Sequence, residues 1–129
     1  MNTISEPYLY KPKITKIDAL GNIDWQRIFN ANSRHYHHFR ASNTYEGDII
    51  LVGSSSQASV SGPQEDAFLT KIDKNGEIIW SYPYGSTDFD DWGWFVFETF
   101  KSNLVLVGST KSFGASLFDI YLVGTDSEG

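Results

Sequence analysis

The chain has 129 residues, of which 40% are hydrophobic and 16% aromatic, so it can build one packed domain and does not have the composition of a disordered chain. Cysteine is absent, which excludes disulfides, cysteine nucleophiles and thiolate metal sites. The net charge of -6 argues against nucleic acid as a partner. Since no apolar run approaches the roughly 20 residues that span a bilayer, we also expect no membrane insertion.

The chain begins with a segment that we interpret as an N-terminal extension, residues 1–12. It has neither the basic nor the apolar region of a secretory signal, so no signal peptide is expected on this chain. The first expected strand, Lys13–Ile17, is followed by the turn Asp18–Gly21. Asp at the first position and Gly at the last are typical of a tight turn.

The strand and turn return further along the chain, so the sequence contains a tandem repeat. Thr15–Trp25 resembles Thr70–Trp80, 55 residues later, and Asp66–Leu69 resembles Asp119–Leu122, 53 residues later. We therefore divide the chain into the extension (1–12), a first repeat (13–66), a second repeat (67–119) and the start of a third (120–129). The recurring positions that we interpret as structural are Asp18, Gly21, Trp25, Gly53, Asp73, Gly76, Trp80, Gly108, Asp126 and Gly129.

Each repeat is expected to contain four short strands, which in the second repeat are Ala67–Ile72, Glu77–Tyr82, Trp92–Thr99 and Leu104–Gly108. The tryptophan of the second strand is expected to pack between neighbouring sheets. Four strands in 53–55 residues predict an all-β fold of antiparallel, four-stranded blades of a β-propeller. A β-sandwich is the alternative, although a sandwich need not repeat.

The second repeat also carries a family-like pattern. Across Asp66–Gly114, the order Asp-x-Phe-Leu-x-Lys-x-Asp-x-x-Gly-x-Ile-x-Trp, then Tyr-Gly, then Leu-Val-Gly-Ser-Thr-x-Ser-Phe-Gly resembles the SBBP-type β-propeller repeats of bacteria and archaea. That resemblance implies a non-enzymatic scaffold or binding module, with relatives that are often exported or on the cell surface. No cofactor is expected.

Propellers close with about 4–8 blades, so two repeats need a partner. The strand before the Asp-x-x-Gly turn is expected three times, where two periods need only two copies. We therefore expect a sector of a larger propeller, and a six-bladed ring of three chains is the alternative. The expected partners are further propeller repeats or other copies of the chain, with a glycan or protein ligand in addition.

The second repeat contains an acidic and aromatic segment that predicts a ligand site. Stacking on tryptophan and hydrogen bonding to carboxylates are what a saccharide needs. The candidate residues for a lectin-like, carbohydrate-binding module are Asp88, Asp90, Asp91, Trp92 and Trp94. A calcium loop and a hydrolase formed only in a complete ring are weaker alternatives, and a solvated acidic loop is the simplest interpretation.

The first repeat has histidines in place of this segment. His35 and His37 would lie on the same side of a strand and are weak candidates for sharing a metal ion, whereas a polar loop or strand edge is the favoured interpretation. The second repeat has no matching ligands, so no metal site is expected as part of the repeat.

Overall fold

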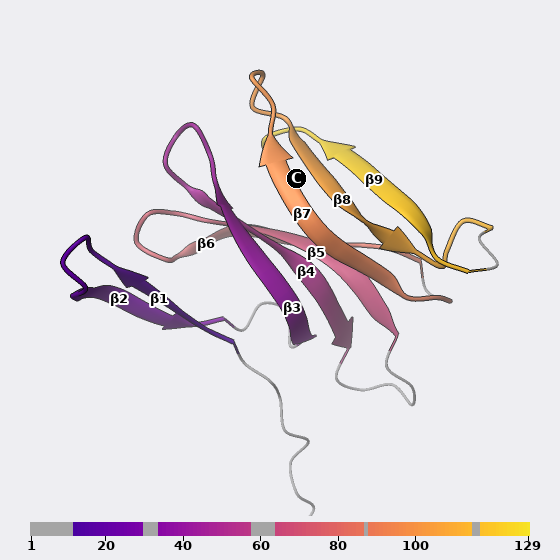
Figure 1. Cartoon of the computed structure of the whole chain (residues 1–129), viewed down its shortest axis with the longest axis horizontal. Helices are drawn as coiled ribbons and strands as arrows, with labels where there is room; N and C mark the ends of the chain where they lie inside the picture. The colour runs from indigo at the N-terminus through magenta and orange to yellow at the C-terminus, as the bar shows by residue number, and fades with distance from the viewer. Residues whose placement is uncertain (1–11, 30–33, 58–63, 87, 115–116) are drawn as a thin grey trace, which may run out of the picture.

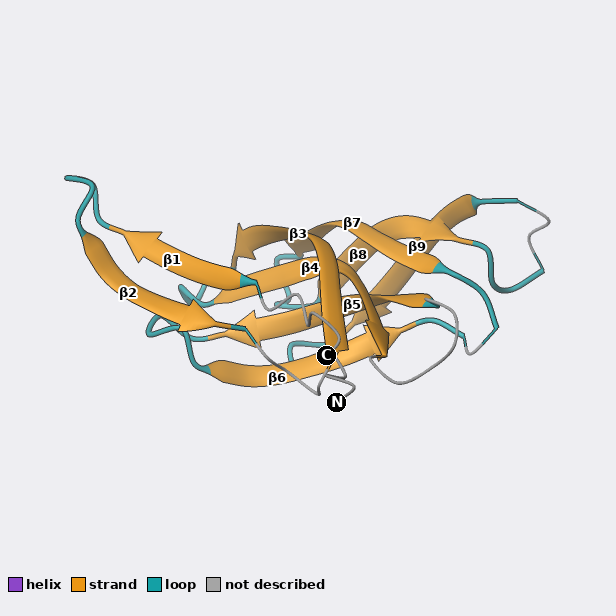
Figure 2. Ribbon diagram, turned by 90° about the horizontal axis from the view of Figure 1, so that it is seen from below, coloured by secondary structure: helices purple, strands orange, loops and turns teal. Residues whose placement is uncertain are grey.

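The computed structural model describes residues 12–29, 34–57, 64–86, 88–114 and 117–129. Nine strands and no helix occur in these residues (Figure 1, Figure 2). The strands are β1 (Lys13–Ile17), β2 (Ile23–Ile28), β3 (Arg34–Asn43), β4 (Ile49–Gln57), β5 (Glu65–Ile72), β6 (Ile78–Tyr84), β7 (Asp91–Glu98), β8 (Leu104–Thr110) and β9 (Asp119–Thr125). The extension predicted at residues 1–12 lies outside the described residues except for residue 12.

The predicted all-β, antiparallel class is confirmed, since all of the strand pairs within the three sheets are antiparallel. The strands predicted in the second repeat match β5 to β8 to within one or two residues at each end. Alternating and β-branched residues account for this agreement, because they fit a pleated surface that is buried on at least one side. The described residues contain no helix long and apolar enough to cross a membrane.

The strands form a hairpin, β1–β2, a four-stranded sheet, β3–β4–β5–β6, and a three-stranded sheet, β7–β8–β9. The four strands of the central sheet are not the four strands of one repeat. Two come from the end of the first repeat and two from the beginning of the second, and the β4–β5 pair joins them with Val52 opposite Leu69. The chain passes to a new sheet after β2 and after β6, in the middle of each repeat (Figure 1).

The Asp-x-x-Gly turns close the hairpins β1–β2 and β5–β6 as predicted. In the first, Gly21 donates its backbone N–H to the carbonyl oxygen of Asp18 at 3.1 Å, and in the second Gly76 donates to Asp73 at 3.0 Å. Both glycines have positive φ, +88° and +83°, a conformation that other residues adopt only with strain. The aspartate side chains accept backbone N–H groups of their own turns, so the aspartate and the glycine are both required locally.

A tryptophan joins each sheet to the next one. The indole Nε1 of Trp25, on β2, donates to the carbonyl oxygen of Lys74 at 2.9 Å, in the Asp-x-x-Gly turn of the following repeat. Trp80, on β6, makes the corresponding bond to Ser127 at 3.3 Å. The tryptophan of one repeat thus binds the turn of the next, which gives a physical reason for its recurrence.

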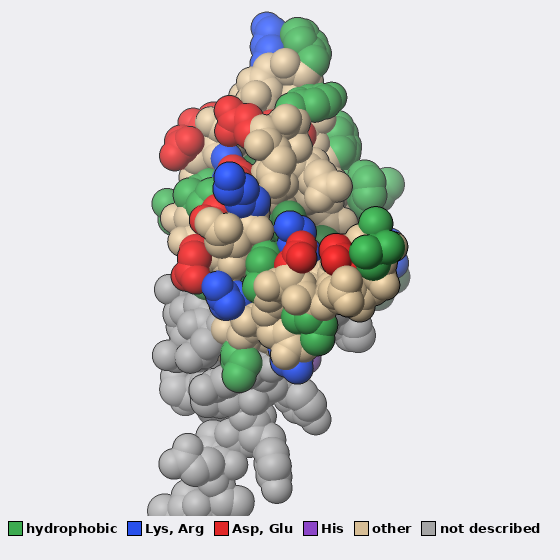
Figure 3. All heavy atoms as spheres, turned by 90° about the vertical axis from the view of Figure 1, so that its left-hand side faces the viewer, with side chains coloured by type: hydrophobic (Ala, Val, Ile, Leu, Met, Phe, Trp, Pro, Cys, Tyr) green, Lys and Arg blue, Asp and Glu red, His purple; other side chains and the backbone are tan. Residues whose placement is uncertain are grey.

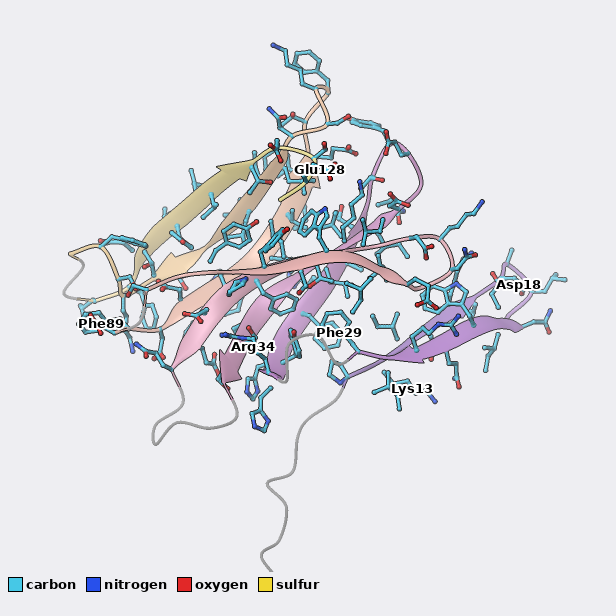
Figure 4. The ribbon with its side chains drawn as sticks, turned by 180° about the vertical axis from the view of Figure 1, so that it is seen from behind. Lys13, Asp18, Phe29, Arg34, Phe89 and Glu128 are labelled. Atoms are coloured by element: carbon cyan, nitrogen blue, oxygen red, sulfur yellow. The ribbon has the colours of Figure 1, made fainter. Side chains whose placement is uncertain are left out.

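Two hydrophobic cores lie between the three sheets. The first joins the hairpin to the central sheet; in Figure 4, Phe29 lies at this junction. Its buried members are Phe29, Tyr36, Leu51, Phe68 and Ile72. The second joins the central sheet to β7–β9, and its buried members are Ile50, Val52, Ala67, Leu69, Trp80, Val96, Leu104 and Leu106. Alternate residues of β4 and β5 enter different cores, so both faces of the central sheet are covered.

Gly76 should tolerate no side chain. An added Cβ would lie 2.8 Å from the ring of Trp25, in addition to the strain of a positive φ. Gly21 has nearly the same φ and nothing within 4 Å, so it is a matched control. We expect Gly76→Ala to lower the free energy of unfolding by about 2–4 kcal/mol, and Gly21→Ala by about 1 kcal/mol, in urea denaturation. Equal losses would contradict the contact with Trp25.

The turn aspartates should make the fold sensitive to acid. Hydrogen bonds from Asn22 to Asp18, and from the Glu77 backbone to Asp73, lower the pKa of these carboxyl groups. A carboxyl whose pKa is lowered by folding stabilises the fold above its ordinary value of about 3.9 and loses that effect as pH falls through the folded value. The double variant Asp18→Asn, Asp73→Asn should therefore lose less stability than the parent in thermal melts between about pH 5 and pH 2. If the melting temperature of the double variant fell with pH as steeply as that of the parent, these carboxylates would not contribute to the acid sensitivity of the fold.

Candidate functional site

The sheet β7–β9 has one face that no part of the described chain covers. We call this the forward face and define it by Phe95, Phe97, Val105, Val107, Ile120 and Leu122. Phe95 lies opposite Val107 on β8, and Val107 lies opposite Leu122 on β9, so these three side chains form a row across the sheet. Ile120 is 82% exposed and Leu122 is 65% exposed.

The forward face corresponds by repeat to a face of the central sheet. By their place in the repeat, Val105 and Val107 correspond to Ile50 and Val52 on the central sheet, and Leu122 corresponds to Leu69. Those three residues are at most 1% exposed because β7–β9 packs on them. On β7–β9, Val105 and Val107 are partly buried and Leu122 is exposed, so the same positions are fully buried where a further sheet follows and less buried where none does. The side of the molecule that bears β1–β2 is different, since acidic, basic and hydrophobic side chains are interspersed there (Figure 3).

Both β3 and β7 contain a β-bulge at the same place in the repeat. The register of β3 against β4 shifts between His37 and Arg40, and that of β7 against β8 shifts between Gly93 and Phe95. In the second bulge, a Cβ on Gly108 would overlap the carbonyl oxygen of Trp92, which explains why this recurring position is glycine. Bulges turn a side chain in a new direction and are frequent beside binding sites.

The two bulges line one recess of about 220 Å³, where β3 and β7 lie against each other. Phe39 and Arg40 come from the first bulge, and Gly93 and Trp94 from the second. The backbone is tight below it, since a Cβ on Gly93 would lie 2.8 Å from the carbonyl oxygen of Gly53. The recess is thus a feature of the inter-sheet packing.

The structure does not bring the predicted carboxylates together as one ligand site. Asp91 is fully buried, and its carboxylate accepts hydrogen bonds from the hydroxyls of Thr110 and Ser112 and from the backbone N–H of Ser86. Asp90 accepts the backbone N–H of Glu65 at 3.1 Å and pairs with Lys111 at 3.5 Å. Both residues therefore hold loops to strands, and the prediction of a solvated acidic loop is wrong for Asp91, which is buried at the start of β7.

The remaining predicted ligand residues lie in different surroundings. Asp88 is exposed, in the loop before β7, and its backbone N–H donates to the Ser86 hydroxyl at 3.4 Å. Trp92 stacks on Phe118 with ring centroids 4.6 Å apart, and within the described residues its indole nitrogen has no acceptor. Of the predicted set, only Trp94 lines the recess.

Strict alternation along β7 would place Trp92, Trp94 and Val96 on one face, and the bulge prevents this. The extra residue shifts the alternation by one, so that Asp91, Gly93 and Val96 are the buried residues. Phe95 and Phe97 share the forward face, and their ring centroids lie 6.3 Å apart.

The histidines of β3 occupy a strand that pairs with serines of β4, His35 with Ser56 and His37 with Ser54. The Nε2 atom of His37 lies 3.9 Å from a carboxylate oxygen of Glu65. Across the described ranges, no group of three or more His, Cys, Asp or Glu side chains is placed to hold a metal ion.

Comparison with known proteins found no family model, no curated protein and no solved structure that matches this chain.

Sequence reasoning missed Phe39 and Arg40 as possible binding residues. One signal was available, because Phe39 and Trp94 are 55 residues apart and both are aromatic. Their joint position in one recess depends on the bulges and on the packing of two sheets, which a repeat alignment does not show.

Asp91 should be a structural residue. Its replacement with alanine would leave two buried hydroxyl groups and a backbone N–H without their acceptor. We expect Asp91→Ala to destabilise the protein by about 3 kcal/mol in urea denaturation. The exposed Asp119, replaced in the same way, should change stability by no more than about 0.5 kcal/mol. If Asp91→Ala left the stability unchanged, the carboxylate would not be a structural group, and a role in ligand binding would be open again.

Proposed function

We propose that this chain is a non-enzymatic scaffold module of the β-propeller type, which works by packing against further sheets of the same repeat. The observation that carries the proposal is the forward face of β7–β9. It repeats positions that are buried in the central sheet, yet Phe95, Phe97, Ile120 and Leu122 are exposed on it and its two valines are only partly buried.

The two interfaces inside the chain support the proposed mode of association. In each interface, one sheet uses the face that corresponds by repeat to the forward face, and the following sheet uses its opposite face. A tryptophan of the first sheet also binds an Asp-x-x-Gly turn of the second. Interfaces of this head-to-tail kind can be extended, and they lead either to a ring or to an open array. In a propeller, blades are added in this way until the ring closes.

The energy available at the forward face is sufficient for specific association. A leucine or phenylalanine side chain contributes about 1.5–3 kcal/mol when it is fully buried. The forward face offers six apolar side chains on a regular three-stranded surface. Large contiguous apolar surfaces are rare on monomeric proteins and mark interaction sites.

The proposal predicts that the chain associates through this face. Leu122 lies in the middle of the row that contains Phe95 and Val107, so a lysine at this position would place a charge in the interface. In sedimentation velocity over a range of protein concentrations, the parent chain should form oligomers and Leu122→Lys should remain monomeric.

Phe100→Lys is the matched control, because Phe100 is 84% exposed and lies in the turn between β7 and β8, outside the forward face. This variant should associate like the parent. A parent chain that stays monomeric at every concentration, or an equal effect of both lysines, would contradict the proposal.

A further inference from the structure

The recess between β3 and β7 has features of a ligand site that the scaffold function does not require. Each repeat has an aromatic residue at its bulge, Phe39 on β3 and Trp94 on β7. Both residues line the recess. They remain 38% and 42% exposed although they lie beside a buried core. Two exposed aromatic rings at one recess offer flat apolar surfaces to a ligand.

Trp94 is held in a defined orientation. Its indole Nε1 donates to the hydroxyl of Ser109, on β8, at 2.9 Å. The side chain therefore does not have to be ordered when a ligand stacks on it, and this lowers the entropic cost of binding.

Arg40 supplies a positive charge at the same place. Within the described part of the chain, its guanidinium forms no ion pair, whereas Arg27 pairs with Glu77 and Arg34 pairs with Asp66. The chain as a whole is acidic, with a net charge of -6, so an arginine that has no ion pair in the described residues and lines the same recess as two aromatic side chains stands out. A planar guanidinium binds a carboxylate through two parallel hydrogen bonds.

We propose that this recess binds one ring of an acidic saccharide. The apolar C–H face of the sugar ring stacks on Trp94 or Phe39, and its carboxylate accepts hydrogen bonds from the guanidinium of Arg40. The proposal replaces the carboxylate acceptors predicted from the sequence, because the carboxylates of Asp90 and Asp91 already accept hydrogen bonds from protein groups. It keeps Trp94 and adds Phe39 and Arg40.

The size and openness of the recess favour a saccharide over a compact ligand. A volume of about 220 Å³ is smaller than the roughly 300–1,000 Å³ of sites that enclose a drug-sized molecule. One ring of an oligosaccharide can occupy it while neighbouring rings and hydroxyl groups remain in water. A fully apolar ligand would leave much of its surface exposed there.

This inference goes beyond the scaffold function, since the recess is formed within a single chain and needs no further sheet. Binding should persist in the Leu122→Lys background even if association is lost. The two proposals can therefore fail separately.

The test is a calorimetric titration of the protein with trigalacturonic acid, supported by tryptophan fluorescence. The parent should bind, and Arg40→Gln and Trp94→Ala should each weaken binding by about ten-fold or more, as expected for the loss of one charge-assisted contact or one stacking partner. Trp94→Phe keeps an aromatic ring but loses the bond to Ser109, so its affinity should lie between those of the parent and Trp94→Ala. This order would show that the loss in Trp94→Ala comes from the missing ring and not from misfolding. Galactotriose, the neutral counterpart, should bind at least about ten-fold more weakly.

A matched control exists in the turn between β7 and β8, where the ammonium group of Lys101 lies 5.7 Å from the ring of Phe100. This is also an exposed cation beside an exposed aromatic ring, so Lys101→Gln and Phe100→Ala should leave binding unchanged. The proposal is overturned if trigalacturonic acid does not bind, if galactotriose binds equally well, or if the control variants weaken binding as much as the recess variants.

Discussion

The contact between a tryptophan and a glycine turn determines how the sheets of this protein follow one another. Trp25 lies on the turn that ends in Gly76, and Trp80 lies on the turn that ends in Gly129, where a Cβ would be 3.1 Å from the Trp80 ring. Each indole also donates a hydrogen bond to a carbonyl oxygen of that turn. The glycine is required twice, for its positive φ and for the approach of the ring. The contact therefore ties the second strand of one repeat to the first hairpin of the next.

The sheets and the sequence repeats are out of phase because β4 of one repeat pairs with β5 of the next. The central sheet combines the last two strands of the first repeat with the first two of the second. Neighbouring repeats are therefore joined by strand pairing within a sheet as well as by packing between sheets. Any exposed sheet at the end of such a series has an apolar forward face, because the next sheet normally covers it. Both proposals build on this arrangement: the forward face provides the surface for association, and the paired bulges of neighbouring sheets provide the recess.

Much of the local structure could be predicted from the sequence. Residue alternation and the Asp-x-x-Gly turns located the strands, and the recurrence of Trp25 and Trp80 indicated a structural role between sheets. The partners of each strand could not be predicted, because pairing between β4 and β5 crosses the boundary of the repeat and is not a property of either segment alone. Of the residues that line the proposed recess, only Trp94 was predicted from the sequence. The bulge changed the alternation around it, and the carboxylates nearby were already bound by serine, threonine and backbone groups.

The most direct test of this account is an NMR measurement of contacts from the indole protons of Trp25 and Trp80. The account predicts nuclear Overhauser effects from the Trp25 indole and ring protons to the α-protons of Lys74 and Gly76, and from those of Trp80 to Ser127 and Gly129. Contacts of Trp25 with its own turn, Asp18–Gly21, or the absence of any contact with the following turn, would contradict the connection between sheets on which both proposals depend.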